Sequence, residues 1–256
     1  MLTELVSGAL ADSDARAIER PLATVEAAAR GRGPAIDAIA ALAPSEHVKI
    51  IAEVKRASPS RGALANIPDP ALLAATYQEA GASAISVLTE QRKFRGSLAD
   101  LEAVRAAVTV PVLRKDFIAN RYQVFEARAA GADIVLLIVA ALDQSTLASL
   151  HALSTELGMT TLVETHSAEE ISRGLDAGAR LLGVNARNLT TFQLDRELFG
   201  TLADHIPSGV IRVAESAVST AADVAHYREG GADVVLVGEA LVTSDPRVTL
   251  REFLAV

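Results

Sequence analysis

Residues 130–138 read AGADIVLLI, in which a small-residue turn leads directly into five consecutive apolar residues. Related turns precede other apolar runs, at Ala80-Gly81-Ala82, Ala177-Gly178-Ala179 and Gly230-Gly231-Ala232. Each turn follows an amphipathic stretch, so its glycine fits the position just after a helix, where a positive φ is common. The repeating unit is therefore a helix, a glycine turn and a buried strand.

Eight such apolar runs are present, and most are continuous rather than alternating. Strands buried on both faces have this pattern, which is typical of a parallel sheet covered by helices. The turns alone also suit an open doubly wound sheet. However, the turns define four repeats of two βα units each, which makes eight βα units. A TIM barrel has eight such units and needs roughly 250 residues. We therefore predict an α/β fold, a (β/α)8 TIM barrel, with strands near residues 49–55, 84–88, 110–115, 134–138, 160–164, 181–185, 211–215 and 234–237.

The first 48 residues precede the first predicted strand and contain three helix-like stretches, at residues 2–10, 12–30 and 34–42. The second stretch has acids and arginines on one side and apolar residues on the other. No Pro/Gly/Ser-rich linker divides the chain. We predict one barrel domain over residues 1–256, with residues 1–48 as an N-terminal helical extension packed on the N-terminal side of the barrel.

The composition argues against several classes of protein. The 256 residues include no cysteine, so disulfides and thiolate metal sites are impossible. A net charge of −8 without a basic tract argues against nucleic-acid binding. The longest apolar run, residues 134–142, is well short of the ~18 residues that a membrane span needs. The N-terminus also lacks the basic start of a secretory signal. We expect a soluble cytoplasmic protein that binds neither nucleic acid nor a membrane.

Lysine is rare in this chain. Only four of the 24 basic residues are lysines, namely Lys49, Lys55, Lys93 and Lys115. Lysine can release a proton at accessible pH, whereas arginine effectively cannot. Lys55 and Lys115 come at the C-terminal ends of predicted strands, which form the catalytic face of a TIM barrel. We therefore predict that both take part in catalysis, the alternative being that each only caps a strand in solvent.

Other polar residues also end predicted strands, among them Glu164, Asn185 and Glu215. Glu53 lies two residues before Lys55, so the two side chains point to the same face of their strand. Charges that point into an apolar barrel are costly unless they are paired. These residues therefore form either an acid–base site, in which neighbours shift one another's pKa, or a purely stabilising salt-bridge network.

Loops at the same face favour a phosphate ligand. TIM barrels often bind phosphate in the loops after the last two strands, here Glu215-Ser216-Ala217 and Gly238-Glu239-Ala240. The segment Ser58-Pro59-Ser60-Arg61-Gly62 adds hydroxyls and a cation, so we predict a sugar-phosphate ligand. The five histidines have no metal-ligand spacing, and His166, which follows a predicted strand, is interpreted as a polar loop residue. We predict neither a metal nor an organic cofactor.

Six of these segments resemble, in order and at the family's spacing, motifs of indole-3-glycerol-phosphate synthase, a TIM-barrel family of tryptophan biosynthesis. The resemblance runs from about Lys49 to the C-terminus, and the N-terminal helices suit the family's extension. The motifs are IAEVKRASPS (51–60), LTE with FRGS (88–90 and 94–97), LRKDF (113–117), LVE (162–164), GVNARNL (183–189) and VAES (213–216).

The resemblance implies a carbon–carbon lyase that closes the indole ring of 1-(2-carboxyphenylamino)-1-deoxyribulose 5-phosphate and releases carbon dioxide and water. It implies that Lys115 is the principal general acid and that Lys55 binds an anionic group and shares the acid role. Glu164 would be the base for dehydration, and Glu53 would orient the lysines. The other residues implied are Asn185, Glu215 and Ser216 in the catalytic set, Phe94 and Phe117 beside the anthranilate ring, and Arg187, Ser58, Leu136, Ala217, Gly238 and Glu239 around the substrate.

Two segments depart from the family pattern. Ala217 stands where the family usually has glycine, which permits φ > 0 and lets the backbone approach a phosphate closely. Glu239 and Ala240 stand where some members have serines, and a nearby acid disfavours phosphate. These substitutions affect phosphate binding and leave the proton-transfer residues intact.

Two other functions remain open at this point: another sugar-phosphate enzyme on the same scaffold, and a non-catalytic barrel that binds a phosphorylated metabolite. The presence of Lys55, Lys115 and Glu164 argues against the second. The sequence does not decide which of these three carries each proton transfer. We expect a monomer, as is common in the family.

Overall fold

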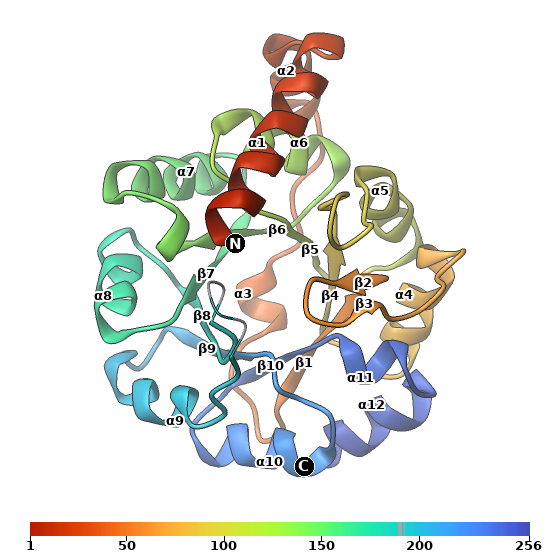
Figure 1. The fold of residues 1–256 in the computed structure, drawn as a ribbon, viewed down its shortest axis with the longest axis vertical. Coiled ribbons are helices and arrows are strands. Elements are labelled where there is room, and N and C mark those ends of the chain that lie inside the picture. Colours follow the sequence, from red (N-terminus) through yellow and green to blue (C-terminus); the bar gives the residue numbers. More distant parts are fainter. Residues whose placement is uncertain (189–190, 192) are drawn as a thin grey trace.

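The computed structural model describes residues 1–188, 191 and 193–256, and within them eight parallel strands form a closed barrel (Figure 1). The strands follow one another around the barrel in the order β1-β10-β9-β8-β7-β6-β5-β4, and β1 closes the ring by pairing with both β4 and β10. The predicted TIM barrel is therefore confirmed. Its strands are β1 (Lys49–Val54), β4 (Ala84–Leu88), β5 (Val112–Lys115), β6 (Ile134–Ile138), β7 (Thr160–Thr165), β8 (Leu181–Asn185), β9 (Ile211–Glu215) and β10 (Val234–Val237).

Helices connect the strands and form an outer layer around the barrel (Figure 1). A short antiparallel hairpin, β2 (Ala57–Ser58) and β3 (Gly62–Ala63), follows β1 and was not predicted. The helices after β3 are α4 (Pro70–Glu79), α5 (Leu98–Ala107), α6 (Arg121–Ala130), α7 (Gln144–Glu156), α8 (Ala168–Asp176), α9 (Leu198–Leu202), α10 (Ala221–Glu229), α11 (Glu239–Val242) and α12 (Pro246–Leu254), with 3-10 turns η1 (Val139–Ala141) and η2 (Ala203–His205).

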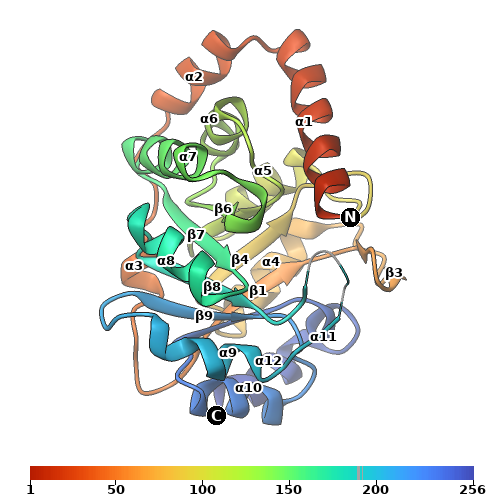
Figure 2. The ribbon, with the colours of Figure 1, turned by 60° about the vertical axis from the view of Figure 1, so that its left-hand side comes forward.

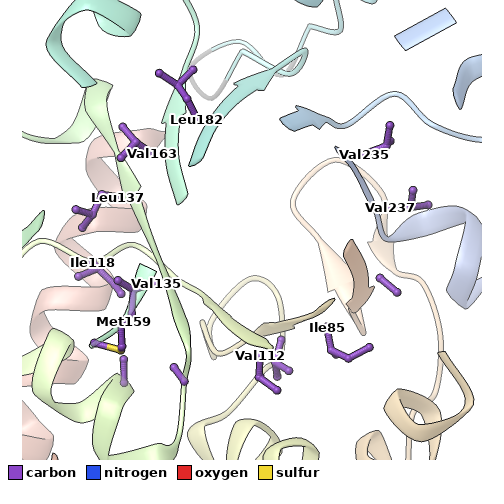
Figure 3. Packing of buried hydrophobic residues seen from close by; sticks show 14 of the residues in the cluster. Ile85, Val112, Ile118, Val135, Leu137, Met159, Val163, Leu182, Val235 and Val237 are labelled. Atoms are coloured by element: carbon purple, nitrogen blue, oxygen red, sulfur yellow. The ribbon is translucent and has the colours of Figure 1, made fainter. Parts of the chain in front are cut away.

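Two apolar layers explain why the strand sequences are continuous rather than alternating. One side of each strand packs against the helices, as Val135, Leu137 and Val163 do in Figure 3. The other side fills the barrel interior, where Ile51 and Leu162 lie in the second cluster. Both faces of each strand are thus removed from water, so the hydrophobic effect stabilises the strand through its interior face and through its helix-facing side.

The repeated glycine turns have the predicted backbone conformation. Gly81, Gly131, Gly178 and Gly231 follow helices and have φ between 92° and 105°, a region that other residues rarely adopt. Each turn reverses the chain from the outer helix layer into the next strand. The repeat recognised in the sequence is therefore the helix-to-strand connection of the barrel.

The N-terminal segment forms α1 (Leu2–Glu19), α2 (Leu22–Arg30) and α3 (Ala38–Ala41). The predicted break after residue 10 is wrong. Instead α1 continues to Glu19 and the chain turns at Pro21, because a proline disfavours helical geometry in the residue before it. Figure 2 shows α1 and α2 diverging from a common apex above α6.

These helices do not all lie where the sequence predicted. The segment leading into α3 is at the N-terminal end of the barrel, as expected, since the backbone N–H of Ile36 donates to Asp133 just before β6. In contrast, α1 lies at the opposite end, where Leu5 lines a cavity together with Lys115. The expectation that the whole extension packs on the N-terminal side was wrong for α1.

A buried ionic network holds α1 against the barrel. Arg114 on β5 is fully buried, and its guanidinium lies 2.9 Å from Asp116 and 2.9 Å from Glu126 of α6. Glu126 also accepts a hydrogen bond of 2.5 Å from Arg16 of α1. The network therefore joins α1 to the strand that carries Lys115.

We expect Glu126→Gln to lower the free energy of unfolding by about 3 kcal/mol, because it leaves a buried arginine short of a counter-charge. Glu79→Gln is the matched control. Glu79 pairs with Arg247 at 2.9 Å on the surface, and such exposed pairs contribute less than about 1 kcal/mol. Urea unfolding of both variants measures the difference, and equal losses would contradict a stabilising role for the network.

Candidate active site

The carboxyl ends of the barrel strands surround a cavity of about 400 Å³. Helix α1 and the loops after β1, β8 and β10 complete its walls. The structure brings all the sequence-predicted site residues together around this one cavity. They are Glu53, Lys55, Ser58, Phe94, Lys115, Phe117, Leu136, Glu164, Asn185, Arg187, Glu215, Ser216, Ala217, Gly238 and Glu239.

One layer of charged side chains forms the floor of the cavity. In a TIM barrel, alternate strands supply the side chains of each interior layer. Here Glu53, Lys115, Glu164 and Glu215 come from β1, β5, β7 and β9, which alternate around the ring. Register alone therefore places one ammonium group among three carboxylates.

Lys115 lies at the centre of this layer. Its Nζ is 3.1 Å from Glu164 Oε2 and 3.1 Å from Glu215 Oε2. Lys55 is higher in the cavity, with Nζ 3.4 Å from Glu53 Oε1 and over the ring of Phe94. The two lysines thus share one connected cluster of carboxylates.

The cluster contains three carboxylates and two ammonium groups, so one carboxylate has no counter-charge. Burial raises the pKa of Glu215 to about 7, since the attraction of Lys115 does not offset desolvation and the charge of Glu164. Burial also favours a neutral Lys115, but the charges of Glu164, Glu215 and Glu53 outweigh it and hold the pKa of Lys115 above its usual value. The site therefore holds a charged lysine beside a carboxyl group that titrates near neutrality.

Glu164 remains ionised in the same surroundings. Burial would raise its pKa, but the charges of Lys115 and His166 and a hydrogen bond from Asn185 lower it. Asn185 Nδ2 donates to Glu164 Oε1 at 3.0 Å, while its Oδ1 accepts from Ser216 Oγ at 2.8 Å. Asn185 thereby holds Glu164 and Ser216 in fixed orientations.

Two glycines provide the space that the carboxylates occupy. A Cβ on Gly183 of β8 would collide with Glu215 Oε1, and a Cβ on Gly238 would lie 2.5 Å from Glu53 Oε1. Any larger residue at either position would push a carboxylate out of the layer. The site thus explains why a glycine, Gly183, lies in the middle of the apolar strand β8.

The opposite wall is apolar and aromatic. Phe94 and Phe117 lie with ring centroids 6.2 Å apart, and Leu5, Leu136 and Ile138 extend the same wall. Aromatic rings prefer offset or tilted contacts at such separations. A planar aromatic group can therefore lie on this wall with its substituents toward the charged layer.

One of the loops predicted to bind phosphate, the loop after β9, has a strained backbone. Ser216 and Ala217 have φ of 72° and 57°, in the left-handed region that glycine adopts freely and other residues rarely enter. Ala217 is the residue at which the resemblance implied a glycine. It adopts a backbone conformation that glycine would adopt without strain.

The acidic side chain in the other loop is paired. Glu239 Oε1 lies 2.5 Å from Arg61 of the β2–β3 hairpin. Arg187 donates to Ser60 of the same hairpin at 3.4 Å. The hairpin thus places an arginine against the acid that disfavours phosphate, which the sequence analysis did not anticipate.

Several cavity residues were not predicted from the sequence. Leu5 belongs to α1, and its part in the site depends on α1 crossing the barrel mouth, for which no local pattern exists. The sequence showed Arg61 as a cation in a loop, but it could not identify Glu239 as the partner of this arginine. Leu189, the last residue of the GVNARNL motif, lies outside the described residues.

Two surveys cover the described part of the chain. None of its helices is both long and apolar enough to cross a membrane. Among the same residues, no three His, Cys, Asp or Glu side chains are grouped so that they could hold a metal ion.

Comparison with known sequences gives a consistent result. The model of the family described as indole-3-glycerol phosphate synthase matches residues 2–253. An indole-3-glycerol phosphate synthase of Leifsonia xyli subsp. xyli is 69% identical over 253 residues, which cover 99% of this chain and 97% of that protein. Another, of Rhodococcus jostii, is 56% identical and covers 98% of this chain and 94% of that protein.

Comparison with solved structures supports the fold alone, because the identities are low. The 3-hexulose-6-phosphate synthase of Salmonella typhimurium superposes with a TM-score of 0.67 at 18% identity, covering 81% of this chain and 97% of that one. Thiamine phosphate pyrophosphorylase of Pyrococcus furiosus gives a TM-score of 0.62 at 16% identity, covering 80% and 93%.

The raised pKa of Glu215 makes stability depend on pH. In the unfolded chain this group titrates near 4.5, and in the folded protein near 7. Its stabilising contribution is therefore full below 4.5 and is lost as the pH rises through about 7. Glu215→Gln cannot ionise, so its free energy of unfolding relative to wild type should increase by up to roughly 3 kcal/mol between pH 5 and pH 8. Urea unfolding at both values measures this.

A matched control for Glu215 is Glu102→Gln, on the exposed face of α5. Its stability relative to wild type should stay constant between the two pH values. The same behaviour in Glu215→Gln would show that the buried carboxyl does not take up a proton on folding.

Ala217→Gly should raise the free energy of unfolding by about 0.5–1 kcal/mol. Relief of the left-handed strain contributes roughly 1–2 kcal/mol, and the greater freedom of glycine in the unfolded chain offsets part of it. Ala65→Gly, in a loop without positive φ, should instead lower stability by about 0.5 kcal/mol. Thermal unfolding compares the two, and destabilisation of both would mean that Ala217 is not strained.

Proposed function

The chain belongs to the indole-3-glycerol phosphate synthase family, and we propose that its barrel cavity closes the indole ring of 1-(2-carboxyphenylamino)-1-deoxyribulose 5-phosphate. This is a lyase reaction of tryptophan biosynthesis that releases carbon dioxide and water. The observation that supports it best is Lys115, held between Glu164 and Glu215 at the floor of a cavity with an aromatic wall.

In the first step, Lys115 donates a proton to the ketone oxygen of the sugar chain. The charges around it keep the lysine protonated, so it begins the cycle as an acid. Protonation makes the ketone carbon electrophilic, and the aromatic carbon that bears the carboxylate attacks it. Loss of carbon dioxide then restores the aromatic ring.

Dehydration completes the indole. The new hydroxyl leaves as water when a lysine protonates it, and Glu164 removes a proton from the adjacent carbon of the former sugar chain. Glu164 suits this role because it is ionised and Asn185 fixes its orientation. Lys55, nearer the mouth, binds an anionic group of the substrate and shares the acid role.

Binding groups divide between the two sides of the cavity. Phe94 and Phe117 form the wall against which the anthranilate ring would lie. The loops around Ser216 and Gly238, with Ser58 and Arg187, would hold the phosphate. In this arrangement the ketone lies between the phosphate and the ring, above Lys115.

Lys115→Met should lower kcat by about 10²–10⁴-fold, the usual contribution of a general acid. The assay follows indole fluorescence in buffer with a chelator, and the chain contains no tryptophan to contribute background. Lys49→Met, at the other end of the barrel, is the matched control and should keep wild-type activity.

Circular dichroism of both lysine variants separates lost chemistry from lost folding. Unchanged turnover in folded Lys115→Met would contradict the role of Lys115. No product from the wild-type protein would favour a different substrate or a non-catalytic barrel.

A further inference from the structure

His166 lies beside the charged layer and has no part in the mechanism above. It follows Glu164 by two residues, just before α8, and its side chain is 14% exposed. Its Nδ1 is 3.2 Å from Glu170 Oε2, and its backbone N–H donates to the same oxygen at 2.7 Å. Its Nε2 is buried without a hydrogen-bond partner and faces Glu164 Oε1 at 3.6 Å.

These contacts form a continuous line from the surface to Lys115. Glu170 is at the outer end, with its side chain 19% exposed, followed by the imidazole, the Glu164 carboxylate and the lysine ammonium. On the other side of Lys115, the Glu215 carboxyl group is buried, and its Oε2 lies 3.1 Å from the ammonium nitrogen. Burial raises the pKa of Glu215 to about 7, so this group can store one proton.

The proposed function requires a supply of protons to this layer. Two protons convert the ketone oxygen into water, one is removed from the sugar chain, and the ionised carboxylate leaves as neutral carbon dioxide. Each turnover therefore takes up one proton from solvent. While substrate or product fills the cavity, the mouth above Lys115 is covered, so a route from the side of the barrel would let the lysine recover its proton.

We propose, on the basis of the proposed function, that His166 recharges Lys115 by passing protons from solvent to Glu164. The Nε2–H bond of the imidazolium breaks as an O–H bond forms at Glu164 Oε1. The protonated carboxyl group releases its hydrogen bond from Asn185, turns about its Cγ–Cδ bond and gives this proton to the neutral amine of Lys115. Glu164 is again a carboxylate, and the imidazole keeps its proton on Nδ1. The ring then turns about its Cβ–Cγ bond, so that the bare Nε2 takes a new proton from water on the Glu170 side and returns to face Glu164.

The geometry suits this transfer. The 3.6 Å separation needs to shorten by about half an ångström to reach hydrogen-bonding distance, and catalytic contacts are often long before substrate binds. Three carboxylates act on the ring, Glu164 of β7, Glu170 of α8 and Glu215 of β9, with Lys115 behind the first. Burial would lower the pKa of His166, but the Glu170 hydrogen bond and these charges raise it, so the donor form is well populated near neutral pH.

A purely structural role for His166 would be to hold the first turn of α8 through Glu170. The backbone N–H already makes that contact, and an asparagine at this position keeps a side-chain donor without a transferable proton. His166→Asn therefore separates proton transfer from helix anchoring. His226→Asn is the matched control, because His226 also lies 3.5 Å from a carboxylate, that of Glu197, which is not part of the charged layer.

The test compares the first turnover with later turnovers by stopped-flow indole fluorescence. In His166→Asn the first turnover should stay within about twofold of wild type, because Lys115 starts protonated. The steady-state rate should fall by about tenfold or more, in the range of lost proton-transfer catalysis. The wild-type steady-state rate should also fall as the pH rises and His166 loses its proton. This decrease should be absent from the pH–rate profile of His166→Asn. His226→Asn should match wild type throughout.

A second variant tests whether a proton donor alone is missing. His166→Ala leaves a gap for a free imidazole, so added imidazole should restore its steady-state rate in proportion to concentration and leave wild type unchanged. Wild-type kinetics in His166→Asn would overturn the relay. The relay would also be overturned if the first-turnover rate and the steady-state rate fell equally and imidazole did not restore activity. That result would indicate that His166 only positions other residues. Failure of the wild-type protein to form indole would instead overturn the proposed function.

Discussion

The ammonium group of Lys115, buried among three carboxylates, is the interaction on which the rest of the site depends. A charge in this position would be prohibitively costly alone, and so would the carboxylates. Barrel closure makes the arrangement possible, because β1, β5, β7 and β9 deliver their side chains to one layer. Gly183 and Gly238 then leave the space that two of the carboxylates fill. The fold therefore creates this layer of charges, and the two glycines give it the room that it needs.

The same constraint extends outward from the floor of the cavity. Next to Lys115, Arg114 points to the other side of β5 and joins the network that reaches α1 through Glu126. A single strand thus carries Lys115 on one face and, on the other, the arginine that links the barrel to α1. Displacement of α1 would therefore disturb both the apolar wall, through Leu5, and the support of the catalytic strand.

The strands were predictable to within two residues because each is buried on both faces, which leaves a continuous apolar run in the sequence. The convergence of the predicted residues on one cavity was expected, because parallel strands end at one face and bring together the polar residues at their ends. The path of α1 was not predictable. It depends on contacts such as Arg16 with Glu126, 110 residues apart, and nothing in the local sequence of α1 specifies that partner.

His166 illustrates the same limit at the level of one side chain. Its sequence position suggested only a polar loop residue. Glu164 and Glu170 lie within four residues of it, but the distances between the three side chains depend on how the chain passes from β7 into α8. Periodicity and strand-end chemistry, which are local, were enough to specify the barrel and its catalytic face. The charge state of the cluster, the pairing of Glu239 with Arg61 and the position of α1 were settled only in the folded chain, because burial and distance between remote residues set electrostatic energies.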